Sequence, residues 1–129
     1  MDPWLAMKYS REAVEFYLLQ ADQALSRHVV MISGQVAGVL AVRGPWLFGP
    51  LIELMALFDG YRSRGVGKKI VEWTAQRCEA KNLWVTVSSD NFRAQKFYER
   101  QGFRKTALLE DLIKPGWDEI LLRKRIARP

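Results

Sequence analysis

Two apolar runs that enclose a glycine-bearing turn and a helical pattern constrain this fold most. The first run, residues 51–58, is too continuously apolar for a strand with one face in water, and the second, residues 83–87, resembles it. Between them an apolar stripe at helical spacing extends from Gly65 to about Ala80. A strand, a helix and a strand in this order form a right-handed crossover. We therefore predict an α/β chain with a central parallel strand pair.

The residues before this unit predict a helix and an antiparallel hairpin. Apolar residues recur at helical spacing from a capping Ser10 to Leu25. Two β-rich runs follow, residues 29–33 and 35–42, and the pair Ser33-Gly34 between them is typical of a tight turn.

The residues after the unit predict a second helix and a second hairpin. Residues 88–91, which are Ser, Ser, Asp and Asn, can cap a helix, and the helical pattern that follows them ends at Gly102. Residues 103–109 and 119–126 are β-like and are separated by a Lys-Pro-Gly turn. With 129 residues and 49% hydrophobic content, the chain is expected to form one domain, 1–129.

The turn at the centre of the unit has the properties of a phosphate-binding site. Gly65 and Gly67 lack a Cβ, so backbone N–H groups at the start of the helix can approach a ligand closely. Basic side chains surround them: Arg62, Arg64, Lys68 and Lys69. The spacing excludes a Walker loop, because Lys69 stands where Ser or Thr is needed, and it excludes a dinucleotide fingerprint, because Ile70 replaces its last glycine.

What remains is the pattern Arg62-x-x-Gly65-x-Gly67, preceded by a strand that contains Glu53. This pattern resembles the pyrophosphate-binding signature of the GNAT acyl-CoA N-acyltransferases. Asn91, then Tyr98 seven positions later and Gly102-Phe103, resemble a later block of that family.

The resemblance implies a mixed, mostly antiparallel α+β sheet with helices on both faces, and acetyl-CoA as the acyl donor. Backbone groups of Met55, Ala56 and Leu57 would bind the pantetheine arm. The pyrophosphate would lie on the loop and helix start, formed by Arg62, Ser63, Arg64, Gly65, Val66, Gly67 and Lys68, and Asn91 and Tyr98 would face the same cofactor.

The chain departs from the family pattern at two places. Only about nine residues precede Ser10, so the first strand of the fold is expected to be missing or vestigial. In the strand 83–87, members that acetylate protein amino termini carry a catalytic glutamate, and Thr86 stands there in this chain.

The chemistry implied by the resemblance requires an acid for the departing thiolate and a neutral amine. A phenol stays protonated at neutral pH, so Tyr98 is the candidate acid, with a half-buried core aromatic as the alternative. Glu53 is the candidate base, since an apolar strand would raise the pKa of its carboxyl. The alternative for Glu53 is an ion pair with an arginine, or a role in orienting the amine.

The other charged residues leave the acceptor open. Glu110, Asp111, Asp118 and Glu119 lie around the last turn and either attract a cationic amine or are solvated charge. We expect a primary amine of a small molecule or protein as the acceptor. A CoA-binding module with little turnover is an alternative, and the net charge of +6 motivates a nucleic-acid-associated protein as another, although no nucleic-acid motif supports it.

The remaining expectations concern the setting. One His and one Cys make a metal site improbable, and a lone cysteine indicates a cytoplasmic protein. No apolar run is long enough to predict a membrane span, and a homodimer is left open.

Overall fold

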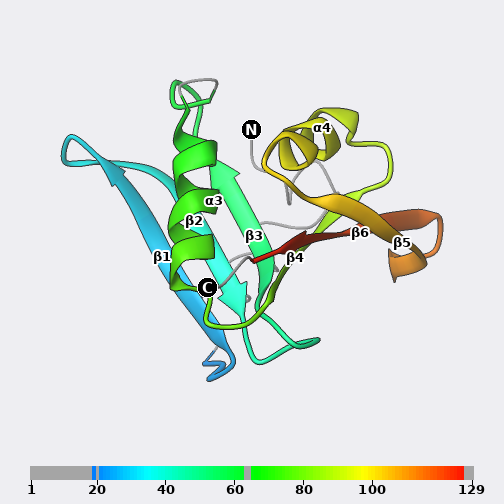
Figure 1. Cartoon of the computed structure of the whole chain (residues 1–129). Coiled ribbons are helices and arrows are strands. Elements are labelled where there is room, and N and C mark those ends of the chain that lie inside the picture. Colours follow the sequence, from blue (N-terminus) through cyan, green and yellow to red (C-terminus); the bar gives the residue numbers. More distant parts are fainter. Residues whose placement is uncertain (1–18, 20, 63–64, 127–129) are drawn as a thin grey trace.

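The computed structural model describes residues 19, 21–62 and 65–126, which form one twisted sheet with two helices (Figure 1). The elements in chain order are β1 Leu25–Ile32, β2 Gln35–Arg43, β3 Leu51–Leu57, α3 Val66–Arg77, β4 Asn82–Ser88, α4 Phe92–Arg100, β5 Arg104–Lys114 and β6 Trp117–Arg125. The strand order is β1-β2-β3-β4-β6-β5, and only β3 and β4 are parallel. The predicted mixed sheet with a central parallel pair is confirmed.

The first hairpin turns where the sequence predicts it. Ser33 and Gly34 both have positive φ, 50° and 79°, which is the turn geometry that suits the twist of two antiparallel strands. Leu25 differs from the prediction: it is the first residue of β1, buried against Ala41 and Leu54, and not the end of a helix. Most of the predicted helix, and the place of a preceding strand, lie outside the described residues.

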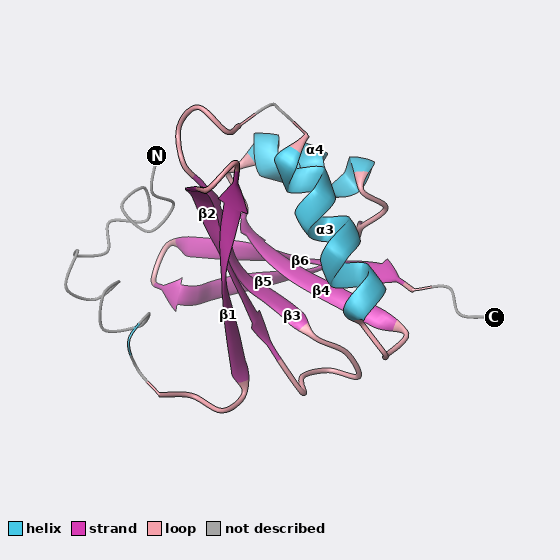
Figure 2. Cartoon of the chain, turned by 90° about the vertical axis from the view of Figure 1, so that its left-hand side faces the viewer, coloured by secondary structure: helices cyan, strands magenta, loops and turns pink. Residues whose placement is uncertain are grey.

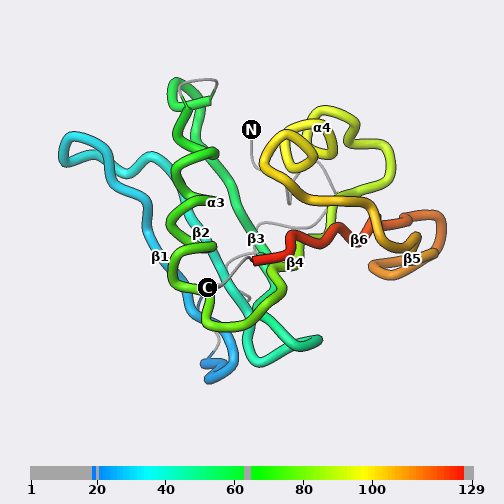
Figure 3. The backbone as a smooth tube through the Cα atoms, viewed as in Figure 1, coloured from blue at the N-terminus to red at the C-terminus, as the bar shows by residue number. Residues whose placement is uncertain are grey.

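The parallel pairing of β3 with β4 is short. It covers only Leu51 with Trp84 and Ile52 with Val85. Directly after Ile52 the register of β3 against β2 shifts by one residue, at Glu53, and such a bulge bends a strand. Figure 3 shows the two strands separating beyond the pairing. The sheet therefore has two halves that meet over two residue pairs.

Both helices pack on the same face of the sheet, as Figure 2 shows. Val66, Ile70 and Val71 of α3 and Tyr98 of α4 share one buried cluster with residues of β2, β3, β4 and β6. Helices on both faces were predicted, and a helix for the other face would fall largely in residues outside those described. Neither described helix is long and apolar enough to cross a membrane.

The last hairpin is longer than predicted, because β5 continues to Lys114 and β6 begins at Trp117. Side chains bridge the irregular part: Asp118 Oδ1 accepts from the Asp111 amide at 2.9 Å, and Asp111 Oδ1 accepts from the Gly116 amide at 2.7 Å. A strand held by acidic side chains lacks the apolar alternation that marks a strand in a sequence.

Candidate active site

The separation of β3 from β4 exposes backbone groups along the inner edge of β3. The Phe58 amide donates to Ala37 of the neighbouring segment, and alternate residues of an antiparallel ladder turn their polar groups the same way. Ala56 therefore faces β2, while the N–H and C=O groups of Met55 and Leu57 face the gap. An extended ligand could add here as a further strand.

The start of α3 lies at the carboxyl end of β3, beside this gap (Figure 1). Gly65 precedes the helix with a left-handed φ of 76°, and its carbonyl accepts from the Lys69 amide at 3.2 Å. The amides of Val66, Gly67 and Lys68 precede that first helical bond. They form a concentration of donors at the positive end of the helix dipole.

Arg62 connects the loop to the strand, since its Nε donates to the Leu57 carbonyl at 3.3 Å. The predicted phosphate ligands Ser63 and Arg64 lie outside the described residues. Lys68 is exposed and pairs with Glu72 at 3.9 Å, so its ammonium group stays at the surface beside the first turn of α3.

Gly67 is small for a reason that the sequence does not reveal. A Cβ at this position would lie 3.0 Å from Cζ and 3.2 Å from Cε1 of Phe97, so α3 and α4 approach closely here. The residue is buried within the helix packing. Its lack of a side chain is accounted for by contact between two helices, in addition to any approach of a ligand.

Two polar side chains of the α4 segment have structural tasks. Asn91 caps the helix, with Oδ1 accepting from the Ala94 amide at 3.1 Å. Gln95 is buried and donates to the carbonyls of Ser88 and Ser89 at 3.1 and 3.0 Å, which holds the end of β4 against the helix.

Tyr98 is buried at 6% exposure between two other rings. Phe97 and Phe103 meet it edge to face, with centroids 5.0 and 5.3 Å away. Burial raises the pKa of Tyr98 well above its ordinary value, so its phenol stays protonated at neutral pH. The side chain can donate a hydrogen bond but is a poor source of a free proton.

Glu53 forms an ion pair. Its two carboxylate oxygens accept from Arg43 Nε at 2.7 Å and Nη2 at 3.2 Å, and Arg43 also contacts Asp22 at 3.0 Å. The pairing with Glu53, more than that with Asp22, raises the pKa of Arg43. The Ala24 amide, followed by Arg43, lowers the pKa of Asp22. Glu53 thus adopts the arginine pairing that the sequence left open as an alternative to a base.

Glu119 is one of the four acidic residues that the sequence places around the last turn, as attraction for a cationic amine or as solvated charge. Its burial shows that Glu119 is not solvated charge. It lies on β6 opposite Ser88 of β4 and is only 4% exposed. The pKa of its carboxyl is raised to about 7, chiefly by burial and also by Asp90, while hydrogen bonding to Thr86 and Trp117 acts to lower it. The available signal was its register: Glu119 alternates with Leu121 on a buried face.

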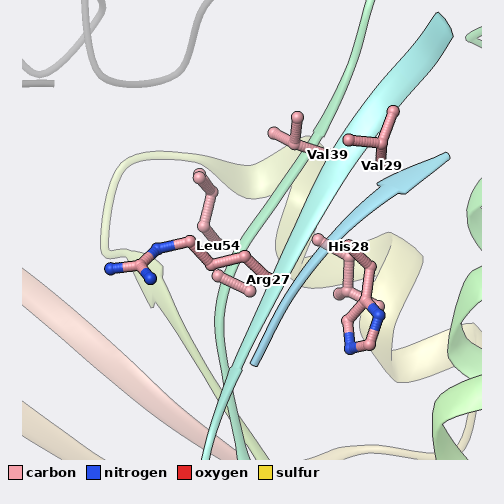
Figure 4. Close-up of a pocket in the computed structure, with 7 residues that line it drawn as sticks. Arg27, His28, Val29, Val39 and Leu54 are labelled. Carbon is pink, nitrogen blue, oxygen red and sulfur yellow. The ribbon is translucent and has the colours of Figure 1, made fainter. Parts of the chain in front are cut away.

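A separate hollow of about 290 Å³ lies on the first three strands. Its walls are apolar apart from Arg27 and His28, and Figure 4 shows Arg27 and Leu54 on one side of the strands with His28 on the other. His28 packs against Trp73 of α3, with centroids 5.1 Å apart. No group of three or more metal-ligating side chains occurs in the part of the chain that is described.

Known proteins share this architecture. A GNAT family acetyltransferase from Elizabethkingia anophelis, solved with acetyl-CoA bound, superimposes with a TM-score of 0.73 at 20% identity, over 90% of this chain and 83% of that one. The ribosomal-protein-S18-alanine N-acetyltransferase of Escherichia coli gives a TM-score of 0.70 at 16% identity, over 94% and 79%. These likenesses show the shared fold.

Sequence comparison agrees with the fold. The N-acetylaspartate synthetase of Xenopus tropicalis is 28% identical over 102 residues, which are 74% of this chain and 37% of that protein. The chain thus spans little more than a third of that relative's length. The model of the acetyltransferase (GNAT) family matches residues 2–103. Because this match covers most of the chain, the protein belongs to the GNAT acetyltransferase family.

Proposed function

We propose that this chain transfers an acetyl group from acetyl-CoA to a primary amine, by direct attack of the amine within a ternary complex. One observation carries the proposal. The gap between β3 and β4 presents the backbone groups of Met55 and the Leu57 amide next to the amides of the first turn of α3.

Donor binding would use these two features together. The arm of the coenzyme would hydrogen-bond to Met55 and Leu57 as an added strand, and Ala56 would contribute through its position between them. The pyrophosphate would lie at the first turn of α3, on the amides of Val66, Gly67 and Lys68, with the loop from Arg62 to Gly65 around it. Solved structures of the same fold with acetyl-CoA or CoA bound support acetyl-CoA as the donor.

Tyr98 is our candidate for the leaving sulfur. Its buried phenol remains neutral and would donate a hydrogen bond to the thiolate as the C–S bond breaks. The high pKa of the phenol makes complete proton transfer to the thiolate unfavourable. We therefore propose that Tyr98 stabilises the thiolate by this hydrogen bond, and that solvent supplies the proton that the thiolate finally gains. Asn91, the N-cap residue of α4, would face the same cofactor through its side-chain Nδ2, because the cap uses Oδ1.

The acceptor would approach over the sheet face opposite the two described helices, because α3 and α4 cover the other face. Relatives act on amines of different sizes, as their names indicate: an aspartate in one case and a protein-terminal alanine in another. L-aspartate, spermidine and an alanine-terminated peptide are therefore the first acceptors to test.

The test combines binding with turnover. Acetyl-CoA at a hundred times its Kd should raise the free energy of unfolding by about 2.7 kcal/mol, while NAD and ATP at equal concentration should not. Free thiol release should then require one of the three amines. Binding without release from any amine would indicate a CoA-binding module, and absence of binding would reject the assignment.

A charge reversal locates the phosphates. Lys68→Glu places a carboxylate at the exposed first turn of α3 and should weaken acetyl-CoA binding about tenfold, the loss expected for one charge-assisted hydrogen bond. Lys81→Glu makes the same change in net charge at the far end of the crossover and should leave the Kd nearly unchanged. Equal effects of the two variants would argue against a pyrophosphate at α3.

A further inference from the structure

We propose that Glu119 accepts the proton of the acceptor amine, reaching the reaction from β6 across β4 on the sheet face opposite α3 and α4. This inference rests on the proposed acetyl transfer and adds the residue that makes the amine nucleophilic.

The register places Glu119 next to the gap. The Trp84 amide bonds to Pro50 of the β3 side, so two residues later the polar backbone groups of Thr86 also face the gap. Glu119 pairs with Ser88 on the other edge of β4, one strand spacing of about 5 Å away. Its side chain lies on the face shared with Trp84 and Leu121, opposite the two described helices, and all three side chains are buried there.

The carboxyl of Glu119 has capacity that the described part of the chain does not use. Its Oε2 is buried and has no partner at hydrogen-bond distance there. The indole Nε1 of Trp117 is also unpartnered, and it lies near enough to the carboxyl to lower its pKa. Unsatisfied buried polar atoms are rare and call for a ligand, a water or a chemical role. An amine, or a water that relays its proton, would satisfy both groups.

The surroundings of Glu119 suit a base that works near neutral pH. On β5 the opposite residue is the apolar Leu109, and on β4 the nearest side chains are the uncharged Ser88 and Thr86. Asp90, after β4, is the charged group acting on it, while Arg123 of β6 is placed over the Trp84 ring. Burial and Asp90 raise its pKa, Thr86 and Trp117 lower it, and the resulting pKa of about 7 suits a carboxylate that takes a proton from an amine.

The proposed step balances as follows. The Glu119 carboxylate takes one proton from the ammonium form of the acceptor, which leaves a neutral amine. The amine nitrogen attacks the thioester carbonyl carbon, so a C–N bond forms and the C–S bond breaks. The amide nitrogen loses its second proton, the CoA thiolate gains one, and one proton passes to solvent from Glu119.

Glu119→Gln tests the role. It keeps the shape of the neutral acid and should fold, but it cannot accept a proton. We expect kcat to fall about 100-fold or more while the Kd for acetyl-CoA stays within threefold of wild type. The rise of kcat/KM with pH near 7 should disappear, and Glu119→Asp should recover part of the rate. Glu79→Gln, a change at an exposed carboxylate after α3, is the matched control and should leave the rate unchanged.

A second readout does not depend on turnover. The 13C signal of the Glu119 carboxyl should titrate near pH 7 in the free protein, and that resonance should be missing in Glu119→Gln. Retention of the wild-type rate and pH profile by Glu119→Gln would overturn the proposal. If the wild-type chain transfers acetyl to none of the three amines, the proposed function itself fails, and the role of Glu119 fails with it. This outcome is distinguishable because it is seen in the wild-type chain, before any substitution.

Discussion

Each half of the sheet holds a carboxyl group next to the gap. One half favours the charged form of its carboxyl group, and the other half favours the neutral form. On the β1–β3 half, Glu53 is 23% exposed and lies against the guanidinium of Arg43. On the β4–β6 half, Glu119 is 4% exposed, with a free Oε2 and Asp90 nearby. An ion pair favours the charged form of an acid, whereas burial favours its neutral form.

The difference shows that position in an apolar strand does not determine the behaviour of an acid. Glu53 lies in the more apolar strand of the two, yet the bulge there brings Arg43 into contact with it. Glu119 lies in a strand with many charges, yet its own position is enclosed. We propose Glu119 as the proton acceptor because no cation is among the groups of the described chain that act on it.

The largest expected effect is on the pH dependence of stability. Glu119 has a pKa of about 7 in the folded chain against 4.5 when unfolded, so the folded chain holds more protons between these values. The contribution of Glu119 to the free energy of unfolding should therefore be fully present below about pH 4.5 and be lost as the pH rises through 7. Relative to wild type, Glu119→Gln should gain up to about 3 kcal/mol between pH 4 and pH 8, measured by urea unfolding. If the free energies of unfolding of the two proteins changed with pH in parallel, Glu119 would not have a raised pKa, and the contrast with Glu53 would be lost.

Breaking the ion pair on the other half should have a smaller effect. Arg43→Met removes the guanidinium that contacts Glu53 and Asp22 and should reduce the free energy of unfolding by about 1–2 kcal/mol at pH 7. The double variant Arg43→Met with Glu53→Gln should recover part of this loss, because the charge of Glu53 is removed together with that of Arg43. A double variant less stable than Arg43→Met would show that the ion pair with Arg43 is not the interaction that stabilises Glu53.

The smallest effect concerns the start of α4. Asn91→Ala removes the cap and should cost about 1 kcal/mol, while Asn91→Asp keeps it. The aspartate places a negative charge where we propose that the cofactor lies, so its Kd for acetyl-CoA, measured by calorimetry, should rise several-fold. An unchanged Kd would restrict Asn91 to capping and leave the cofactor to contacts on the β3 half.

Much of the architecture could be predicted because its signals are local. The turn at Ser33-Gly34, the helix ending before Gly102 and the two apolar runs depend on backbone propensity and periodicity within a few residues. The extension of β5 was missed, since Asp111 and Asp118 replace ladder bonds with side-chain bonds. The reason for Gly67 was incomplete, because Phe97 lies on another helix.

The sequence by itself determined the order of the described elements and the central parallel pair, and it predicted the phosphate loop, because periodicity, turns and glycine positions are short-range properties of the chain. Only the tertiary structure decided which acid is paired and which is buried. Arg43 reaches Glu53 through the pairing of β2 with β3, and Glu119 is enclosed by strands distant in sequence. Ionisation depends on the surrounding charges and solvent, which exist only once the strands are in register.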